Sequence, residues 1–277
     1  MIEILEANNI LFFIIIMLIT AIPVGFFAGL FGIGGGLITV PFLFFIFETL
    51  NIDKQYLMHL AVGTSFAIII PTSIVSVLTH KKHKAVDNNI IKTYGVYVIS
   101  GVLLGTLFAA LMQTKSLMVF FSIVVYFLGT YLLLLQEKTK KIKKKFGIYH
   151  KIVFGFISGF VSAPMGIGGA VMNVPILRYF GYSINIAIGS AAAVGFIIAL
   201  FGAVGFLVSG SFLKANLPLS VGFINIPAFL IFIPVTTFMA RIGANTAHEI
   251  DKIKLQKFFG IFLYVIGTIF LYRYLNI

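Results

Sequence analysis

The chain has 277 residues, of which 60% are hydrophobic and only 10% are charged, and its net charge is +12. Soluble domains carry about a quarter charged residues, so this composition excludes a soluble protein and predicts an integral membrane protein. Cysteine is absent, which excludes disulfides, thiolate nucleophiles and cysteine-based metal or iron–sulfur sites. Because Lys and Arg gather in the cytoplasmic loops of membrane proteins, we assign the positive charge to topology and expect no nucleic-acid partner.

The first nine residues contain two Glu and no Lys or Arg. A signal peptide has a basic first segment, so we expect the first apolar run to be retained. Apolar runs of about 20 residues can cross a membrane as helices. They lie at roughly 10–31, 57–79, 89–111, 116–135, 185–208, 217–240 and 253–274, with shorter apolar pieces at 36–47, 152–165 and 168–180. This pattern predicts an all-α, polytopic transmembrane helical bundle of about 8–10 membrane segments.

A glycine-rich motif occurs twice and organises the chain. GFFAGLFGIGGGLITVP, residues 25–41, returns as GFISGFVSAPMGIGGAVMNVP, residues 155–175. Adjacent glycines closed by Pro disfavour a continuous helix, and a membrane tolerates such a break only where protein or a water-filled cavity receives the freed backbone groups. The sequence therefore predicts a glycine-broken hairpin in each half. Paired breaks at corresponding places indicate the binding site of a secondary transporter.

The repeat extends beyond the motif. Residues 59–64 resemble residues 185–190, and residues 126–130 resemble residues 264–268. Self-similarity over this length predicts two complete structural units. We therefore expect a first transmembrane repeat at 1–135, a basic cytoplasmic linker at 136–150 and a second transmembrane repeat at 151–277.

The distribution of positive charge predicts the orientation. If the N-terminus lies outside, all but four of the 20 Lys and Arg residues fall in cytoplasmic loops, the exceptions being Lys54, Lys115, Lys214 and Arg273. Matching loops of the two halves then lie on opposite sides of the cell membrane, which predicts inverted repeats. The basic segment 138–145 of the linker is either a solvated hinge or a site for anionic lipid headgroups, so membrane lipid is an expected partner.

Ionisable residues are nearly absent from the expected spans, and no paired-carboxylate, Ser/His/Asp or H-E-x-x-H pattern supports catalysis. We therefore expect no enzyme activity, no cofactor and no metal. Consecutive glycine N–H groups and helix starts bind anions without a full charge. Substrate binding is predicted at both glycine breaks and at polar side chains near them, namely Gly34, Gly35, Gly36, Thr39, Thr64, Ser65, Gly168, Gly169, Asn173 and Ser190. Asn225 is a more distant candidate.

Several of these residues have a purely structural alternative. The spaced glycines at 25 and 29, 101 and 105, and 155 and 159 let helices pack closely, whereas adjacent glycines favour contact with a ligand. Thr64, Ser65 and Ser190 could instead bond their own helix backbone. His59 is expected at a pocket edge rather than as a proton shuttle, because its repeat partner, Asn185, does not titrate.

The two copies of G-x-G-G-[GA]-x-x-x-V-P, residues 32–41 and 166–175, resemble the paired signature of the sulfite exporter TauE/SafE family of membrane permeases. The resemblance covers essentially the whole chain. It implies a secondary transporter that moves a small anion, such as sulfite, sulfoacetate or a related organosulfur or organic acid anion, across the cytoplasmic membrane by alternating access. It also implies a coupling ion, H⁺ or Na⁺.

The second copy of the motif departs from the first. It has Ala170 where the first copy has a third Gly, and residues 162–165 are inserted before its glycines. The second half of the pocket is therefore expected to be tighter or reshaped. Two other classes of membrane protein could carry the same glycine motifs. A channel-like anion pore would need no alternating access, and a non-transporting membrane interaction protein would move no anion. The motif itself fixes neither the substrate, the direction nor the oligomeric state.

Overall fold

The computed structural model describes residues 7–31, 35–134, 146–247, 249 and 252–276. These residues form ten α-helices and one β-hairpin. The elements of the first half are α1 (Ala7–Phe31), α2 (Gly36–Thr49), α3 (Leu57–Lys82), α4 (Asn88–Leu111) and α5 (Thr114–Leu134). The remaining elements are α6 (Ile148–Met165), α7 (Ala170–Tyr179), α8 (Ile184–Phe212), β1 (Ser220–Val221), β2 (Ile224–Asn225), α9 (Ile226–Thr246) and α10 (Lys252–Asn276).

Within the described residues, eight helices are long and apolar enough to cross a membrane. The other two, α2 and α7, have 14 and 10 residues and are too short to cross alone. This arrangement confirms the all-α polytopic bundle. One expected range was wrong in length, because the piece at 152–165 belongs to the 18-residue helix α6. Another was wrong at its start, because residues 220–225 of the run at 217–240 form the β-hairpin.

Each short helix begins at a glycine with a left-handed backbone. Gly35 is the N-cap of α2 with φ 80°, and Gly169 is the N-cap of α7 with φ 71°. Gly166, with φ 64°, caps the end of α6. A side chain disfavours this conformation, which explains why glycine occurs where α6 stops and where each short helix starts.

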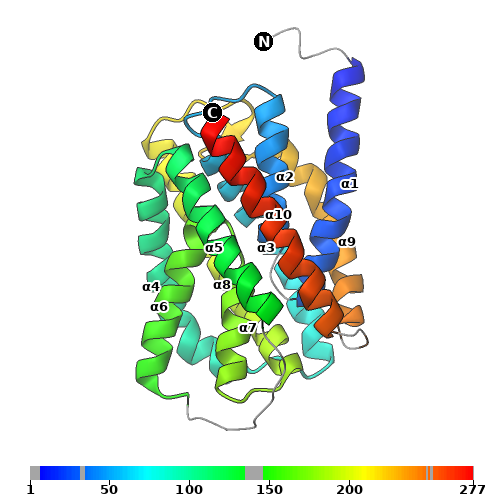
Figure 1. Ribbon diagram of the computed structural model, residues 1–277, viewed down its shortest axis with the longest axis vertical. Coiled ribbons are helices and arrows are strands. Elements are labelled where there is room, and N and C mark those ends of the chain that lie inside the picture. Colours follow the sequence, from blue (N-terminus) through cyan, green and yellow to red (C-terminus); the bar gives the residue numbers. More distant parts are fainter. Residues whose placement is uncertain (1–6, 32–34, 135–145, 248, 250–251, 277) are drawn as a thin grey trace.

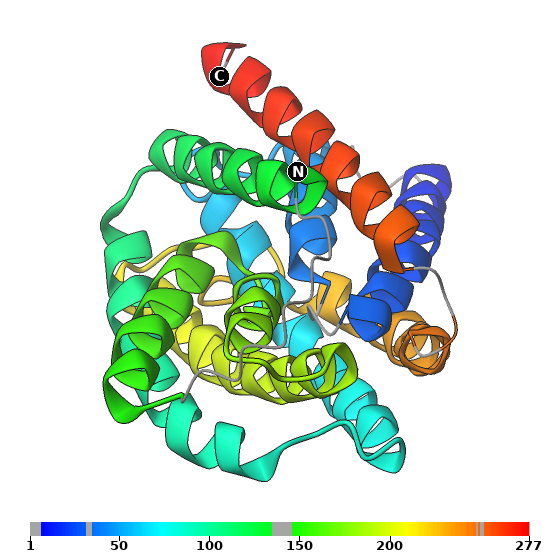
Figure 2. The ribbon, with the colours of Figure 1, turned by 60° about the horizontal axis from the view of Figure 1, so that its bottom comes forward.

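The two halves of the chain are interleaved rather than side by side. Helix α1 packs on α9, α4 on α6, α5 on α10 and α3 on α8, and Figure 2 shows these pairs around the bundle. Matching α1–α5 in order with α6–α10 makes α1 the counterpart of α6 and α9 the counterpart of α4. The packed pair α1·α9 then corresponds to the packed pair α6·α4, and α2·α3 corresponds to α7·α8. A two-fold relation between the halves predicts this exchange. In Figure 1, α1 and α6 run in opposite directions along the bundle.

Spaced glycines bring the paired helices into backbone contact. A Cβ on Gly29 would lie 2.0 Å from the carbonyl oxygen of Ala240, and a Cβ on Gly159 would lie 2.2 Å from that of Val98. A Cβ on Gly101 would likewise lie 2.1 Å from the carbonyl oxygen of Phe156. No side chain fits at these positions, so the helix-packing interpretation of the three spaced pairs is confirmed.

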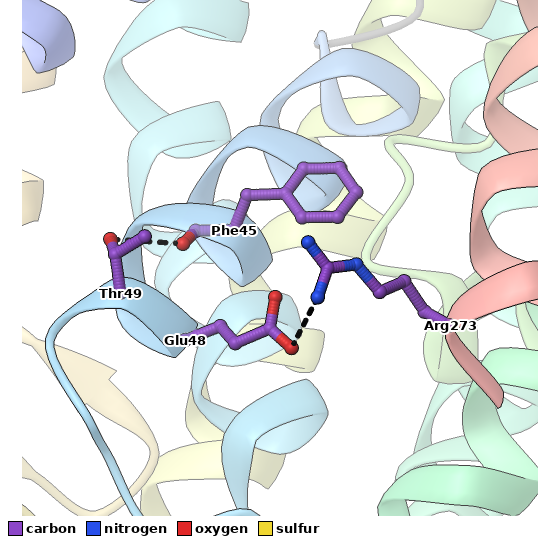
Figure 3. A network of polar contacts seen from close by, with 4 residues as sticks. All are labelled: Phe45, Glu48, Thr49 and Arg273. Atoms are coloured by element: carbon purple, nitrogen blue, oxygen red, sulfur yellow. Dashed lines mark hydrogen bonds and ion pairs between the residues drawn. The ribbon is translucent and has the colours of Figure 1, made fainter. Parts of the chain in front are cut away.

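Helices α3 and α8 lie at the centre, and residues 57–69 of α3 are all buried. At one end of the bundle α10 is held to α2, because Arg273 Nη1 donates a hydrogen bond to Glu48 Oε1 at 3.3 Å and its guanidinium lies 5.8 Å from the ring centre of Phe45 (Figure 3). The two charged side chains are 44% and 19% exposed. At that exposure such a pair contributes at most about 1 kcal/mol, so packing determines the position of α10.

Candidate functional site

The two glycine breaks touch each other. A Cβ on Gly36, the first residue of α2, would lie 2.0 Å from the carbonyl oxygen of Gly166 and 2.8 Å from Cα of Ile167. Ser65 of α3 donates a hydrogen bond from Oγ to the same Gly166 oxygen at 3.0 Å. The chain segments at which α2 starts and α6 ends therefore meet beside α3, in the interior of the bundle.

The second break carries a buried polar cluster, which we call the Asn173 cluster: Tyr94, Ser158, Ser162 and Asn173. Asn173 lies in the first turn of α7 and is fully buried. Its Oδ1 accepts hydrogen bonds from the Tyr94 hydroxyl and from Ser158 Oγ, each at 2.7 Å. Among the described residues, none accepts a hydrogen bond from its Nδ2. This amide nitrogen is 3.1 Å, and Ser162 Oγ 3.3 Å, from the position that a Cβ on Gly169 would occupy.

The first break has apolar surroundings instead. Thr39 occupies the position of Asn173, but its Oγ1 donates to the carbonyl oxygen of Gly35 in its own helix turn at 3.0 Å. The atoms nearest to a Cβ on Gly35 belong to Val24 and Ala28. The polar groups of this centre are therefore concentrated at the second break.

Two other predicted residues hold helix starts. Thr64 Oγ1 accepts the backbone N–H of Asn225, and Ser190 Oγ accepts that of Asp87, both at 2.9 Å. Asp87 and Asn225 are the N-caps of α4 and α9, and their side chains accept N–H groups of the first turn. The two bonds are repeat counterparts. They fix α4 and α9 to the central helices α8 and α3.

Among the described residues outside the spans, Tyr182 has a perturbed pKa. Burial raises the pKa of Tyr182, in the α7–α8 connection, and the negative charge of Asp87 raises it further. The Tyr182 hydroxyl therefore stays protonated over the physiological range.

His59 lies at the edge of the bundle centre that is nearer the β-hairpin. Its Nε2 is 3.0 Å from the carbonyl oxygen of Ala109, and its ring centre lies 5.1 Å from that of Phe223 and 5.9 Å from that of Tyr56. This aromatic packing places His59 among residues that close the bundle at the α8–α9 connection. No acidic partner is among these contacts.

Comparison with known proteins decides the family. A model of the family "Sulfite exporter TauE/SafE" matches residues 16–270. The chain belongs to the TauE/SafE family. A "Probable membrane transporter protein" of Haemophilus influenzae is 32% identical over 255 residues, which cover 92% of this chain and 97% of that one. Proteins of Methanocaldococcus jannaschii and Bacillus subtilis, also named probable membrane transporter proteins, are 26% and 24% identical over 92% and 94% of this chain and 94% and 97% of theirs. No solved structure matches.

Membership of the TauE/SafE family, together with eight apolar helices, makes this chain a multi-pass membrane transporter. The resemblance inferred from the paired motif is confirmed. Of the predicted site residues, the structure brings Gly36 and Ser65 to the second break, and it places Gly169 beside Asn173. Gly35 starts α2, and the Gly168 carbonyl oxygen faces Gly195 of α8. Gly34 lies outside the described residues.

Three polar residues of this TauE/SafE protein were missed by sequence reasoning: Tyr94, Ser158 and Ser162. Ser162 opens the insertion that distinguishes the second motif, and Ser158 lies between its spaced glycines, so both were visible as differences between the two copies. Tyr94 lies far away in sequence, and nothing in the motif indicates it. Only the packing of α4 on α6 brings its hydroxyl to Asn173.

Proposed function

We propose that this protein is a secondary transporter for a small anion, and that the anion binds where the two glycine breaks meet. The observation that carries the proposal is the contact between Gly36 and Gly166, because it puts the start of α2 against the second break from which α7 starts. A helix start presents unpaired N–H groups and the positive end of its dipole, so it stabilises negative charge without a cationic side chain. Broken helices that meet in this way bind anionic substrate groups in other transporter folds.

The proposed site consists of the second-break residues Gly168, Gly169 and Asn173, the first-break residues Gly35 and Gly36, and Ser65. Gly34 belongs to it by its place in the motif. Thr64 and Ser190 contribute indirectly, through the helix starts that their hydroxyls hold. Thr39 is left out, because its hydroxyl is bonded within its own helix.

The same contacts support a mechanism of alternating access. In this conformation the first break, α3 and the second break are in direct contact through Gly36, Ser65 and Gly166. An anion between the breaks requires them to separate, and interleaved halves permit one half to move against the other. We propose sulfite, sulfoacetate or a related organosulfur or organic acid anion as substrate, in line with the family description, and H⁺ or Na⁺ as the coupling ion.

The experiment is transport by purified protein in liposomes. Uptake of [³⁵S]sulfite is measured against its concentration, with and without an imposed pH or Na⁺ gradient, and protein-free liposomes are the control. Saturating uptake, counterflow and acceleration by one of the gradients are expected. Flux that rises linearly with anion concentration, together with large unitary currents, would show that the protein is a pore and not a carrier. If uptake of every proposed anion equals uptake by protein-free liposomes, the transporter is refuted in favour of a non-transporting membrane interaction protein.

A further inference from the structure

The two breaks differ in chemistry at three corresponding positions. Asn173 follows Gly169 by four residues, as Thr39 follows Gly35. Ser158 and Ala28 hold the same place between the spaced glycines of their motifs. Tyr94 and Phe232 each lie seven residues after the N-cap of their helix, α4 or α9. The second break thus has an amide and two hydroxyls where the corresponding positions of the first break have a self-bonded threonine, a methyl group and a phenyl ring.

Hydrogen bonding fixes the orientation of the Asn173 side chain. Both hydroxyls donate to Oδ1, and that of Tyr94 also donates, at the longer distance of 3.2 Å, to the carbonyl oxygen of Phe154. Oδ1 has two lone pairs and is therefore fully used. The NH₂ group consequently points away from Tyr94 and Ser158. It is completely buried and has no acceptor among the described residues. A buried donor without an acceptor destabilises a fold, so its presence at the centre of a transporter indicates an acceptor that comes and goes.

The unused NH₂ group is aimed at the start of α7. Nδ2 and Ser162 Oγ both lie within 3.3 Å of the place where a Cβ on Gly169, the N-cap of that helix, would be. The first N–H groups of a helix have no intrahelical partner. An amide and a hydroxyl therefore approach the N-cap of the helix that carries these N–H groups. The terminal methyl of Ile198 lies 2.1 Å from the same position and has to move when a ligand enters.

We propose that the Asn173 amide, held in orientation by Tyr94 and Ser158, donates to an oxygen atom of the transported anion at the start of α7. This inference rests on the proposed function and deepens it. Asn173 and Ser162 contact the ligand, and Tyr94 and Ser158 are positioning residues that act through Oδ1.

The donors define the class of ligand. None of the hydrogen bonds of the Asn173 cluster comes from a Lys, Arg or His side chain of the described residues. The cost of removing an ion from water rises with the square of its charge, and a few uncharged donors offset this cost less completely for a double charge than for a single one. Within the proposed substrate class the site therefore selects a singly charged oxyanion, such as hydrogen sulfite, a monosulfonate or a monocarboxylate, over the dianions sulfite and sulfoacetate.

The test measures thermal stabilisation of purified protein by methanesulfonate, acetate and sulfate, because a ligand that binds only the folded state raises its apparent stability. Wild-type protein is expected to be stabilised by methanesulfonate or acetate at lower concentrations than by sulfate. Stronger stabilisation by methanesulfonate indicates a sulfonate substrate, and stronger stabilisation by acetate indicates a carboxylate. Equal or stronger stabilisation by sulfate would overturn the selection for single charge.

Variants test the residues. Asn173→Leu should raise the Kd for the preferred anion about tenfold or more. The double variant Tyr94→Phe with Ser158→Ala keeps the shape of the cluster and should raise KM in liposomes with little change in kcat, whereas each single variant leaves one donor on Oδ1 and has a smaller effect. Ser158→Thr restores a hydroxyl and should retain wild-type KM. Tyr97→Phe, one turn along α4, is the matched control and should change neither constant.

Two outcomes separate this inference from the proposed function. If folded Asn173→Leu, or the double variant when Asn173→Leu does not fold, binds the anion with the wild-type constant, the assignment of the amide is overturned while transport stands. If the wild-type protein neither binds nor transports any of the anions, the proposed function fails first.

Discussion

Gly36 presents its bare α-carbon to the carbonyl oxygen of Gly166, with room for nothing larger than hydrogen, since a Cβ would lie 2.0 Å from that oxygen. The two residues belong to different halves of the chain and to different glycine breaks. Their contact joins the start of α2 to the end of α6. The glycines of the first motif therefore allow the two breaks to pack closely, in addition to allowing the left-handed backbone at Gly35.

The first prediction concerns this contact. Gly36→Ala should push the breaks apart, break the Ser65–Gly166 hydrogen bond and reduce the transport rate by on the order of tenfold, because the obstructing atom is backbone and cannot rotate away. Transport is measured in liposomes and normalised to inserted protein. Gly147→Ala is the matched control, since the nearest atom to its Cβ is 3.8 Å away. Wild-type transport in Gly36→Ala would show that the breaks do not need to close.

The second prediction compares the two N-cap glycines. Gly35→Ala and Gly169→Ala each force a residue with a side chain into a left-handed backbone, at a cost of about 1–2 kcal/mol. At Gly35 the added Cβ also meets the backbone oxygen of Val24 at 2.9 Å, whereas at Gly169 the nearest atom is the terminal methyl of the Ile198 side chain at 2.1 Å. We therefore expect Ile198→Val to restore part of the melting temperature lost in Gly169→Ala.

Val24→Ala supplies the matched comparison, because it shortens a side chain but leaves the backbone oxygen of residue 24 in place. It should not restore Gly35→Ala to the same degree. Equal rescue at both positions would mean that side-chain crowding, and not the backbone contact, decides the cost at Gly35.

The third prediction separates structure from binding at the central hydroxyls. Thr64→Val removes the acceptor of the buried Asn225 N–H and should lower stability by about 1–3 kcal/mol while leaving the KM of the remaining folded protein close to wild type. Ser190→Ala should act alike through Asp87. Thr79→Val, whose hydroxyl bonds only the Val75 carbonyl oxygen of its own helix, is the control. A KM increase at unchanged stability would instead place Thr64 or Ser190 in contact with substrate.

Much of this architecture could be predicted from the sequence because the signals are local. Apolar runs gave most of the spans, and adjacent glycines indicated both breaks, since left-handed residues such as Gly35 and Gly169 are strongly disfavoured for other amino acids. The spaced glycines 25/29, 101/105 and 155/159 indicated close helix contacts for the same reason.

The rest depends on tertiary contacts that no local pattern contains. Thr64 and Ser190 lie on α3 and α8, the helices that follow the motif-bearing α2 and α7, yet their hydroxyls bond the N-caps of α9 and α4. Asn173 was predicted from its place in the motif, but the partner that orients it, Tyr94, arrives only with α4. The β-hairpin at 220–225 was missed because its residues continue an apolar run. Only two polar residues interrupt that segment, Ser220 and the α9 N-cap Asn225.

The last prediction concerns orientation across the membrane. In Figure 1 the connection between α3 and α4 lies at one end of the bundle, while the α4–α5 and α8–α9 connections lie at the other end with the start of α1 and the end of α10. Lys82 is exposed at the first end, and Gln113 and Ser211 are exposed at the second. The chain has no cysteine of its own, so single introduced cysteines report one position each.

Lys82→Cys should react with a membrane-impermeant thiol reagent only after the cells are opened, whereas Gln113→Cys and Ser211→Cys should react on intact cells. The physical reason is the excess of Lys and Arg at the α3–α4 end, which favours retention in the cytoplasm. Residue 82 is the last of α3 and residue 211 is the second-last of α8. These helices are counterparts in the two halves, so inverted repeats require labelling from opposite sides. Labelling of Lys82→Cys and Ser211→Cys from the same side would refute the inversion of the repeats. Labelling of Lys82→Cys alone on intact cells would show the opposite orientation in the membrane while leaving the inversion intact.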